Sequence, residues 1–143
     1  MPGQEFEVRQ AGDLPADAVR RLYECAGWWK GGDREDLIPG LLGGSRCVAA
    51  AFAGPDLVGM GRLLSDGVSD AYIQDVVVLP GHRGHGVGSA IVAFLRDWCL
   101  DRGIGWVGLV AEPGSRPFYE RLGFAEMSGY VPMKCSLEER RHS

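Results

Sequence analysis

The stretch from Ala71 to Ser89 reads AYIQDVVVLPGHRGHGVGS, and it decides the fold. Its first half is a run of apolar and β-branched residues as far as Leu79, which predicts a buried strand that Pro80-Gly81 ends. From Gly86 onward the apolar residues recur at helical spacing, until Gly103 supplies the expected C-terminal stop. A strand therefore runs through a glycine-rich turn directly into a helix.

Upstream of this stretch, the patterns predict a strand, two helices and a β-hairpin, in that order. These elements span Glu5–Arg9, Pro15–Ala26, Asp33–Leu42, Arg46–Ala53 and Leu57–Leu64. Downstream, the patterns predict a buried strand, a short helix, two candidate closing strands and a charged tail. These segments span Gly105–Ala111, Ser115–Leu122, Phe124–Glu126, Tyr130–Cys135 and Glu138–Ser143.

This order of elements predicts an α/β domain of the layered α+β type, with a mixed, mainly antiparallel central sheet flanked by helices. A length of 143 residues and the absence of a linker or an internal repeat indicate a single domain over residues 1–143. Hydrophobic residues make up 45% of the chain and charged residues 24%, as in an ordinary soluble protein.

The formal net charge of −4 argues against a nucleic-acid partner, because such proteins usually carry a basic stripe. No apolar run approaches the roughly 20 residues of a membrane span, and the N-terminus is polar, so we expect a cytoplasmic protein without a membrane partner. The four cysteines form no CxxC and the three histidines offer no ligand set. We therefore expect no metal.

The turn between the predicted strand and helix has the character of an anion site. Glycines allow backbone N–H groups to approach an anion, and the helix N-terminus adds partial positive charge. Arg83 and Ser89 add further donors. The ending of a P-loop is missing, and Gly84-x-Gly86-x-Gly88 has the wrong spacing for a dinucleotide fingerprint. The alternative is a loop that only turns a strand into a helix.

Two motifs give this chain a family resemblance. Arg83-x-x-Gly86-x-Gly88, after Val76-Val77-Val78-Leu79-Pro80, resembles motif A of the GNAT acetyltransferase superfamily, and Phe118 to Phe124 (FYERLGF) resembles its motif B. The resemblance covers Ala71 to Phe124. It implies an acetyl-CoA-dependent N-acetyltransferase with a splayed strand pair that holds CoA. Within the superfamily, the chain is most similar to small arylalkylamine- and polyamine-type enzymes.

The resemblance also implies roles for individual residues. The backbone of Val76, Val77 and Val78 would pair with the pantetheine arm, although core packing better explains their side chains. Tyr119 would protonate the leaving CoA thiolate, and the alternative is a tyrosine that only packs its ring. The pyrophosphate would be bound, mostly through backbone N–H groups, by Arg83, Gly84, His85, Gly86, Val87, Gly88 and Ser89.

Two positions depart from the family pattern. Glu112 stands where an Asn usually bonds the pantetheine, and Gln74 stands where polyamine-type relatives have a glutamate base. Asp75, Glu112, Glu24 or water could replace that base. Strand alternation predicts Gln74 on one face with Val76 and Val78, and Asp75 with Ile73 on the other. Asp75, inside an apolar run, is either a structural hydrogen-bonding residue or functional.

The expected acceptor is a primary amine on a small molecule. Its nitrogen would attack the thioester carbonyl of acetyl-CoA directly. Two alternatives are a non-catalytic acyl-CoA-binding regulatory module and an acetyltransferase for protein lysines or N-termini. Trp28 and Trp29 follow the first predicted helix, where they either stack on an amine or anchor their loop. A homodimer is expected on family grounds.

Overall fold

The structure is a computed structural model that describes residues 5–30 and 34–136. The chain forms two compact units, residues 1–109 and residues 110–143. A single domain over the whole chain stays a prediction.

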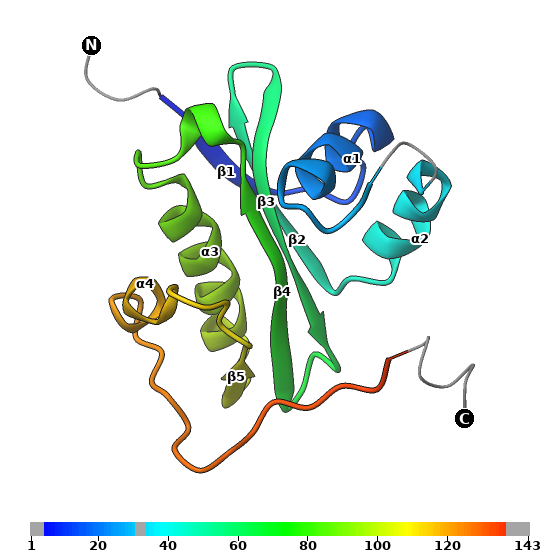
Figure 1. The fold of residues 1–143 in the computed structure, drawn as a ribbon. Helices are drawn as coiled ribbons and strands as arrows, with labels where there is room; N and C mark the ends of the chain where they lie inside the picture. The colour runs from blue at the N-terminus through cyan, green and yellow to red at the C-terminus, as the bar shows by residue number, and fades with distance from the viewer. Residues whose placement is uncertain (1–4, 31–33, 137–143) are drawn as a thin grey trace. The chain divides into compact units, whose positions relative to one another are not determined.

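The first unit contains a five-stranded sheet with the strand order β1-β2-β3-β4-β5 (Figure 1). Its strands are β1 (Glu7–Gln10), β2 (Cys47–Ala53), β3 (Asp56–Ser65), β4 (Asp70–Val78) and β5 (Trp106–Gly108). The first four strands pair in an antiparallel manner, and β5 runs parallel to β4. The mixed, mainly antiparallel sheet expected from the sequence is therefore confirmed, with β5 shorter than the predicted Gly105–Ala111.

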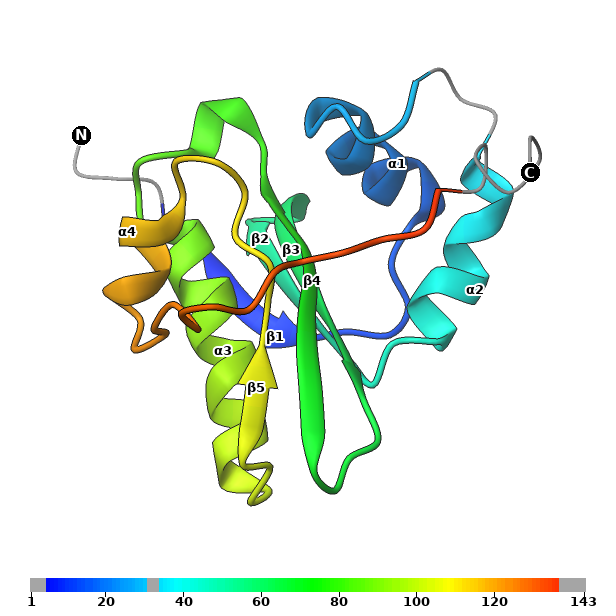
Figure 2. The ribbon, with the colours of Figure 1, turned by 60° about the horizontal axis from the view of Figure 1, so that its bottom comes forward.

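Helices cover the sheet from both sides (Figures 1 and 2). On one side, α1 (Ala16–Cys25) contacts β3 and β4, and a 3₁₀ turn, η1 (Glu35–Leu37), leads into α2 (Ile38–Gly43). On the other side lies α3 (Val87–Asp101). The second predicted helix thus begins with a 3₁₀ turn, and its expected first residue, Asp33, lies outside the described residues.

Both helical layers bury one face against the sheet. The helix α1 buries Val19, Leu22 and Tyr23 against the sheet. The helix α3 approaches β3 closely, since a Cβ built on Gly61 would lie 2.8 Å from Ile91 Cγ2. Residues along α3 that are fully or nearly buried are Val87, Ile91, Val92, Leu95, Trp98 and Cys99.

The second unit contains one short helix, α4 (Arg116–Glu120), and long irregular segments. The two closing strands predicted at Phe124–Glu126 and Tyr130–Cys135 are wrong, because neither segment has strand structure. Tyr130 and Val131 are 78% and 74% exposed. A β-alternating pattern becomes a strand only where another strand satisfies its backbone, and within the described part of this unit no such neighbour exists.

Candidate functional site

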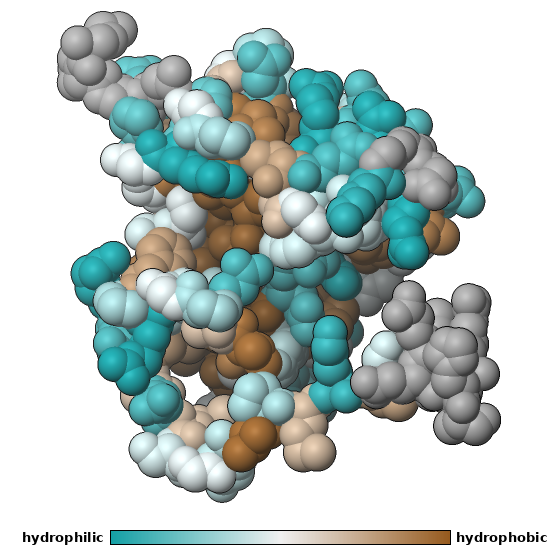
Figure 3. Space-filling model, in the orientation of Figure 1, coloured by the Kyte–Doolittle hydropathy of each residue, from teal (hydrophilic) through white to brown (hydrophobic). Residues whose placement is uncertain are grey.

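The strand β4 loses its neighbour β5 after the first third of its length. It pairs with β5 through Asp70, Ala71 and Tyr72, and the pairing ends where Tyr72 meets Gly108. Beyond that point β4 continues to Val78, and no strand among the described residues pairs with this edge (Figure 2). In the space-filling view, apolar atoms lie along the line of β4 between the hydrophilic surfaces of the flanking helices (Figure 3).

The hydrogen-bonding direction of each residue on this edge follows from one contact. The Leu79 N–H donates to the Val58 carbonyl on β3 at 2.8 Å. Because backbone groups alternate between the two edges of a strand, those of Val77 also face β3, and those of Val76 and Val78 face the open edge. Val77 itself packs in the buried core. The open backbone groups of this part of the edge therefore belong to Val76 and Val78.

The turn after β4 carries a row of backbone N–H groups without an acceptor. Arg83 and Ala90, at its two ends, donate their N–H groups to the carbonyls of Pro80 and Gly86. Between them, from Gly84 to Ser89, no N–H group has an acceptor among the described residues. Gly84 and Gly86 have φ of 81° and 85°, in the left-handed region that glycine adopts without strain. The predicted anion-binding turn therefore has the free donors that it needs.

The guanidinium of Arg83 points back toward the sheet. Its Nε donates to the Val78 carbonyl at 2.9 Å, and its Nη2 donates to Cys25 Sγ at the end of α1 at 3.6 Å. In this arrangement Arg83 occupies the Val78 acceptor on the open edge. The remaining residues of the turn, His85 among them, are exposed or half-buried except Val87, which is buried.

A β-bulge interrupts β4 in front of these residues. The register of β3 with β4 shifts between Met60 and Arg62, and Asp75 has φ of 56°. The prediction from strict alternation is therefore wrong. Gln74 is the partner of Arg62 and lies on the α1 face, where Asp75 also points. Val76 lies on the α3 face, since a Cβ built on Gly61 would lie 3.3 Å from Val76 Cγ2 and 2.8 Å from Ile91 Cγ2 on α3.

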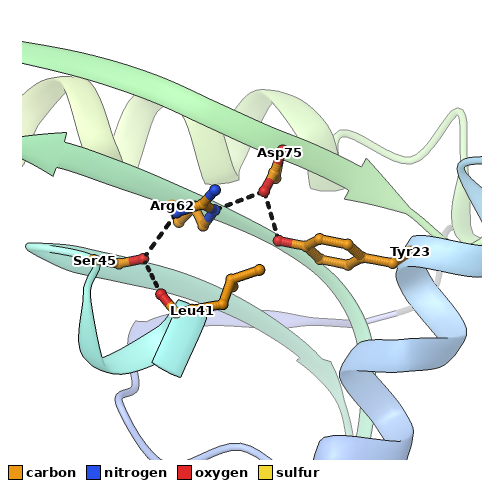
Figure 4. A network of polar contacts seen from close by, with 5 residues as sticks. All are labelled: Tyr23, Leu41, Ser45, Arg62 and Asp75. Atoms are coloured by element: carbon orange, nitrogen blue, oxygen red, sulfur yellow. Dashed lines mark hydrogen bonds and ion pairs between the residues drawn. The ribbon is translucent and has the colours of Figure 1, made fainter. Parts of the chain in front are cut away.

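Asp75 is the centre of a polar network that the sequence did not predict (Figure 4). Its Oδ2 accepts hydrogen bonds from the Tyr23 hydroxyl and from Arg62 Nε, both at 2.6 Å. Arg62 Nη1 also reaches Ser45 Oγ at 3.5 Å, and that hydroxyl donates to the Leu41 carbonyl. The only signal for this network in the sequence was a carboxylate within an apolar run, which left a structural hydrogen-bonding role and a functional role both open. The structure shows the hydrogen bonds of Asp75.

The charges of the network are coupled. Burial, then the hydrogen bond and charge of Asp75, raise the pKa of Tyr23 far above its usual range. Burial lowers the pKa of Arg62, but the hydrogen bond and charge of Asp75 outweigh it, so this pKa is raised. Arg62 and Asp75 therefore form an ion pair with a neutral Tyr23 as its second donor.

The two tryptophans after α1 pack around Tyr23. The ring centroid of Trp28 lies 5.3 Å from that of Tyr23 in an edge-on arrangement, and the centroid of Trp29 lies 4.7 Å from it. Trp29 also packs against the core, whereas Trp28 is 36% exposed. Trp29 therefore anchors the loop, and Trp28 offers the more accessible ring.

The other base candidates lie apart from this network. Glu24 on α1 forms an ion pair with Arg20 at 3.8 Å. Glu112 belongs to the second unit, where it lies close enough to influence Tyr119 on α4. Burial, followed by the negative charge of Glu112, raises the pKa of Tyr119. Its ring packs edge-on between Phe118 and Phe124. The phenol therefore keeps its proton at neutral pH.

Within residues 5–30 and 34–136, no three His, Cys, Asp or Glu side chains gather closely enough to hold a metal ion. In the same part of the chain, no helix is both long and apolar enough to cross a membrane.

Comparison with known proteins places the chain in a family. A family model with the description "Acetyltransferase (GNAT) family" matches residues 16–124. The chain belongs to this family. The match spans α1 through Phe124, and so includes the bulge, the open edge of β4, the glycine-rich turn after β4 and Tyr119.

Relatives within this GNAT family cover different parts of the chain. A streptothricin acetyltransferase from Streptomyces lavendulae is 32% identical over 131 residues, which are 84% of this chain and 68% of that protein. A histone acetyltransferase from Glycine max is 43% identical over 68 residues, 48% of this chain. This match spans only 29% of the soybean protein.

Solved structures share the fold. A GNAT-family acetyltransferase from Streptococcus pneumoniae superimposes with a TM-score of 0.79 at 24% identity. The match covers 92% of this chain and 98% of that one. The architecture of a sheet with helices on both sides is thus that of the GNAT family.

Proposed function

We propose that this chain is an acetyl-CoA-dependent N-acetyltransferase that transfers the acetyl group to a primary amine by direct attack on the thioester. One observation carries the proposal. The open edge of β4 at Val76 and Val78 leads directly into the row of free N–H groups from Gly84 to Ser89. An extended amide-containing arm that ends in a pyrophosphate matches this sequence of donors and acceptors.

The residues present fit acetyl-CoA. Pantetheine amides can pair with backbone groups of Val76 and Val78, as an added strand does. The pyrophosphate suits the N–H groups at the start of α3, where the helix dipole also favours negative charge. Arg83 can add a charge-assisted contact when its guanidinium leaves the Val78 carbonyl.

The proposed reaction is a single displacement. The nitrogen of a neutral amine forms a bond to the thioester carbon, and the bond from that carbon to sulfur breaks. The N–H of Val76 faces the open edge and can donate to the developing oxyanion. Tyr119 gives its proton to the CoA thiolate, and the amine gives up a proton to water. Holding both reactants together supplies much of the rate.

No side chain beside β4 acts as the base in this proposal. Gln74 cannot accept a proton at neutral pH, and Asp75 Oδ2 already accepts two hydrogen bonds in an ion pair. We therefore infer that the amine must arrive already neutral. The acidic limb of the pH–rate profile should then move with the pKa of the amine, from one acceptor to the next.

We infer that the acceptor is a small cationic or aromatic amine, as in the arylalkylamine- and polyamine-type enzymes. The exposed ring of Trp28 supports this inference, because an aromatic face attracts cations and other rings. The relative from Streptomyces lavendulae is named a streptothricin acetyltransferase, which adds streptothricin to the candidate acceptors.

The test is release of free CoA thiol from acetyl-CoA with a panel of aryl, polyamine, amino-sugar and peptide acceptors. We expect acceptor-dependent thiol release with at least one class of small amine. Acetylation of peptides alone would instead support a protein-directed enzyme.

Gln74 favours one rival function, a regulatory module that binds acyl-CoA without catalysis. Stabilisation of the protein by acetyl-CoA in a thermal-shift assay, without thiol release for any amine, would establish it. The proposed homodimer is tested separately by light scattering.

A further inference from the structure

Asp75 is held in the left-handed backbone conformation, which residues other than glycine adopt only uncommonly. It is the one non-glycine residue with positive φ among the described residues, at 56°. An L-residue in this region carries backbone strain, and the conformation persists only where the surroundings fix it. The strain falls directly before Val76, the residue whose N–H faces the open edge.

Two elements fix Asp75 from the α1 face (Figure 4). Tyr23 comes from α1 and Arg62 from β3, and both donate to the same oxygen, Oδ2, at 2.6 Å. Each donor is itself restrained. The ring of Tyr23 contacts both Trp28 and Trp29, and Arg62 contacts Ser45, whose hydroxyl donates a hydrogen bond to Leu41 of α2.

The bulge decides where the next residues point. Without it, strict alternation would keep Gln74 and Val76 on one face of β4. With it, Gln74 and Asp75 both lie on the α1 face and Val76 lies on the α3 face. A bulge re-aims the groups that follow it. The direction of the Val76 N–H therefore depends on the conformation of Asp75.

We propose that Tyr23, Arg62 and Asp75 form a positioning network that holds the β4 bulge and thereby aims the Val76 N–H at the thioester carbonyl. This inference rests on the proposed function, since it assumes that acetyl-CoA lies along the open edge. Asp75 is a positioning residue here and takes no proton in the reaction. Because Tyr23 also packs against Trp28, the network joins the aromatic loop after α1 to the same backbone donor.

The test measures the carbonyl itself. Infrared difference spectra of bound acetyl-CoA labelled with ¹³C at the thioester carbonyl report how strongly donors polarise that bond. The measurement needs no acceptor amine. Three variants are compared with the wild type: Tyr23→Phe, Asp75→Ala and Asp75→Gly. Tyr23→Phe keeps the ring that contacts the two tryptophans, and Asp75→Gly removes the carboxylate but tolerates φ of 56°.

The matched control is Asp70→Asn. Asp70 is an exposed aspartate at the start of the same strand, outside the network. The Asp70→Asn substitution should leave both the carbonyl band and turnover unchanged. Circular dichroism and thermal melting show whether each variant is folded at the temperature of the measurement.

In the wild type we expect the bound carbonyl band at lower frequency than in water. In Tyr23→Phe and Asp75→Ala it should move back toward the value in water, with kcat lowered about tenfold or more and CoA affinity within about threefold. The carbonyl band and kcat of Asp75→Gly should lie closer to those of the wild type than the values of Asp75→Ala do.

Bands that stay unchanged in Tyr23→Phe and Asp75→Ala, with acetyl-CoA bound, would overturn the positioning role and leave the proposed function intact. Equal losses in Asp75→Gly and Asp75→Ala would also count against it. If the wild type bound no acetyl-CoA, the proposed function would fail, and this inference with it.

Discussion

Arg83 Nε lies 2.9 Å from the carbonyl oxygen of Val78, so a side chain of the glycine-rich turn contacts the open edge of β4. The same guanidinium is the one cation within the turn itself. We therefore expect it to exchange Val78 for a phosphate oxygen when CoA binds.

Arg83→Gln should weaken CoA binding by about tenfold or more, because a hydrogen bond to a charged group contributes about 1.5–3 kcal/mol. Isothermal titration calorimetry with CoA measures this change. Arg21→Gln is a suitable control, since Arg21 is exposed on α1 and pairs only with Asp17 among the interactions of the described residues. An unchanged dissociation constant in Arg83→Gln would place the pyrophosphate elsewhere.

Gly86→Ala should destabilise the turn that leads into α3. Gly86 has φ of 85° as the residue before the helix, and a left-handed L-residue costs about 1–2 kcal/mol. Urea denaturation should show this loss, and calorimetry should show weaker CoA binding. Gly81→Ala, in the same segment with ordinary φ and open space around it, should have little effect on either quantity. Similar losses in both variants would contradict a special role for Gly86.

Gly61→Ala tests the contact between β3 and α3. The new Cβ would lie 2.8 Å from Ile91 Cγ2 and 3.2 Å from Leu95 Cδ1, both well packed. Overpacking of this kind costs about 1–3 kcal/mol, which chemical denaturation can measure. Gly40→Ala on α2 meets nothing within 4 Å and should be neutral or slightly stabilising. A neutral Gly61→Ala would mean that α3 can shift away from the sheet.

Tyr119→Phe should lower turnover and leave acetyl-CoA affinity nearly unchanged. The pKa of Tyr119 is raised by burial and by Glu112, so the phenol stays protonated beyond the usual tyrosine range. A general acid with a raised pKa loses its proton, and with it its catalytic role, only as the pH rises through that pKa. The fall in turnover at high pH that is due to Tyr119 should therefore lie above about pH 10. Glu112→Gln removes the negative charge that raises this pKa, so it should move the fall to lower pH. Wild-type turnover in Tyr119→Phe across the whole pH range would remove the residue from the mechanism.

The segment from β4 to α3 could be predicted from sequence because its signals are local. The apolar run ending at Pro80, the glycines of the turn and the helical spacing after Gly86 all lie within a few residues of the structure that they determine. The family resemblance rests on the same segment. This agreement between local patterns and the fold explains why the sheet, the helices and the turn were anticipated.

The bulge at Asp75 could not be predicted in this way. Its hydrogen-bond partners lie 52 and 13 residues away in the chain, and their contact depends on how α1 packs on the sheet. The prediction of two C-terminal strands was wrong for the opposite reason, because it used local pattern alone. The pattern at Tyr130–Cys135 is locally suitable for a strand, but alternation does not specify a neighbour that would satisfy the backbone.

The early separation of β4 from β5 has a consequence for handling the protein. Unpaired strand edges readily recruit other chains, and such recruitment leads to aggregation. Arg83 caps one carbonyl on this edge with a charged group, which is a common protection of exposed strands. A bound CoA would cover the remaining groups and, through mass action, favour the folded state. Purification in the presence of CoA should therefore yield more soluble and more slowly aggregating protein.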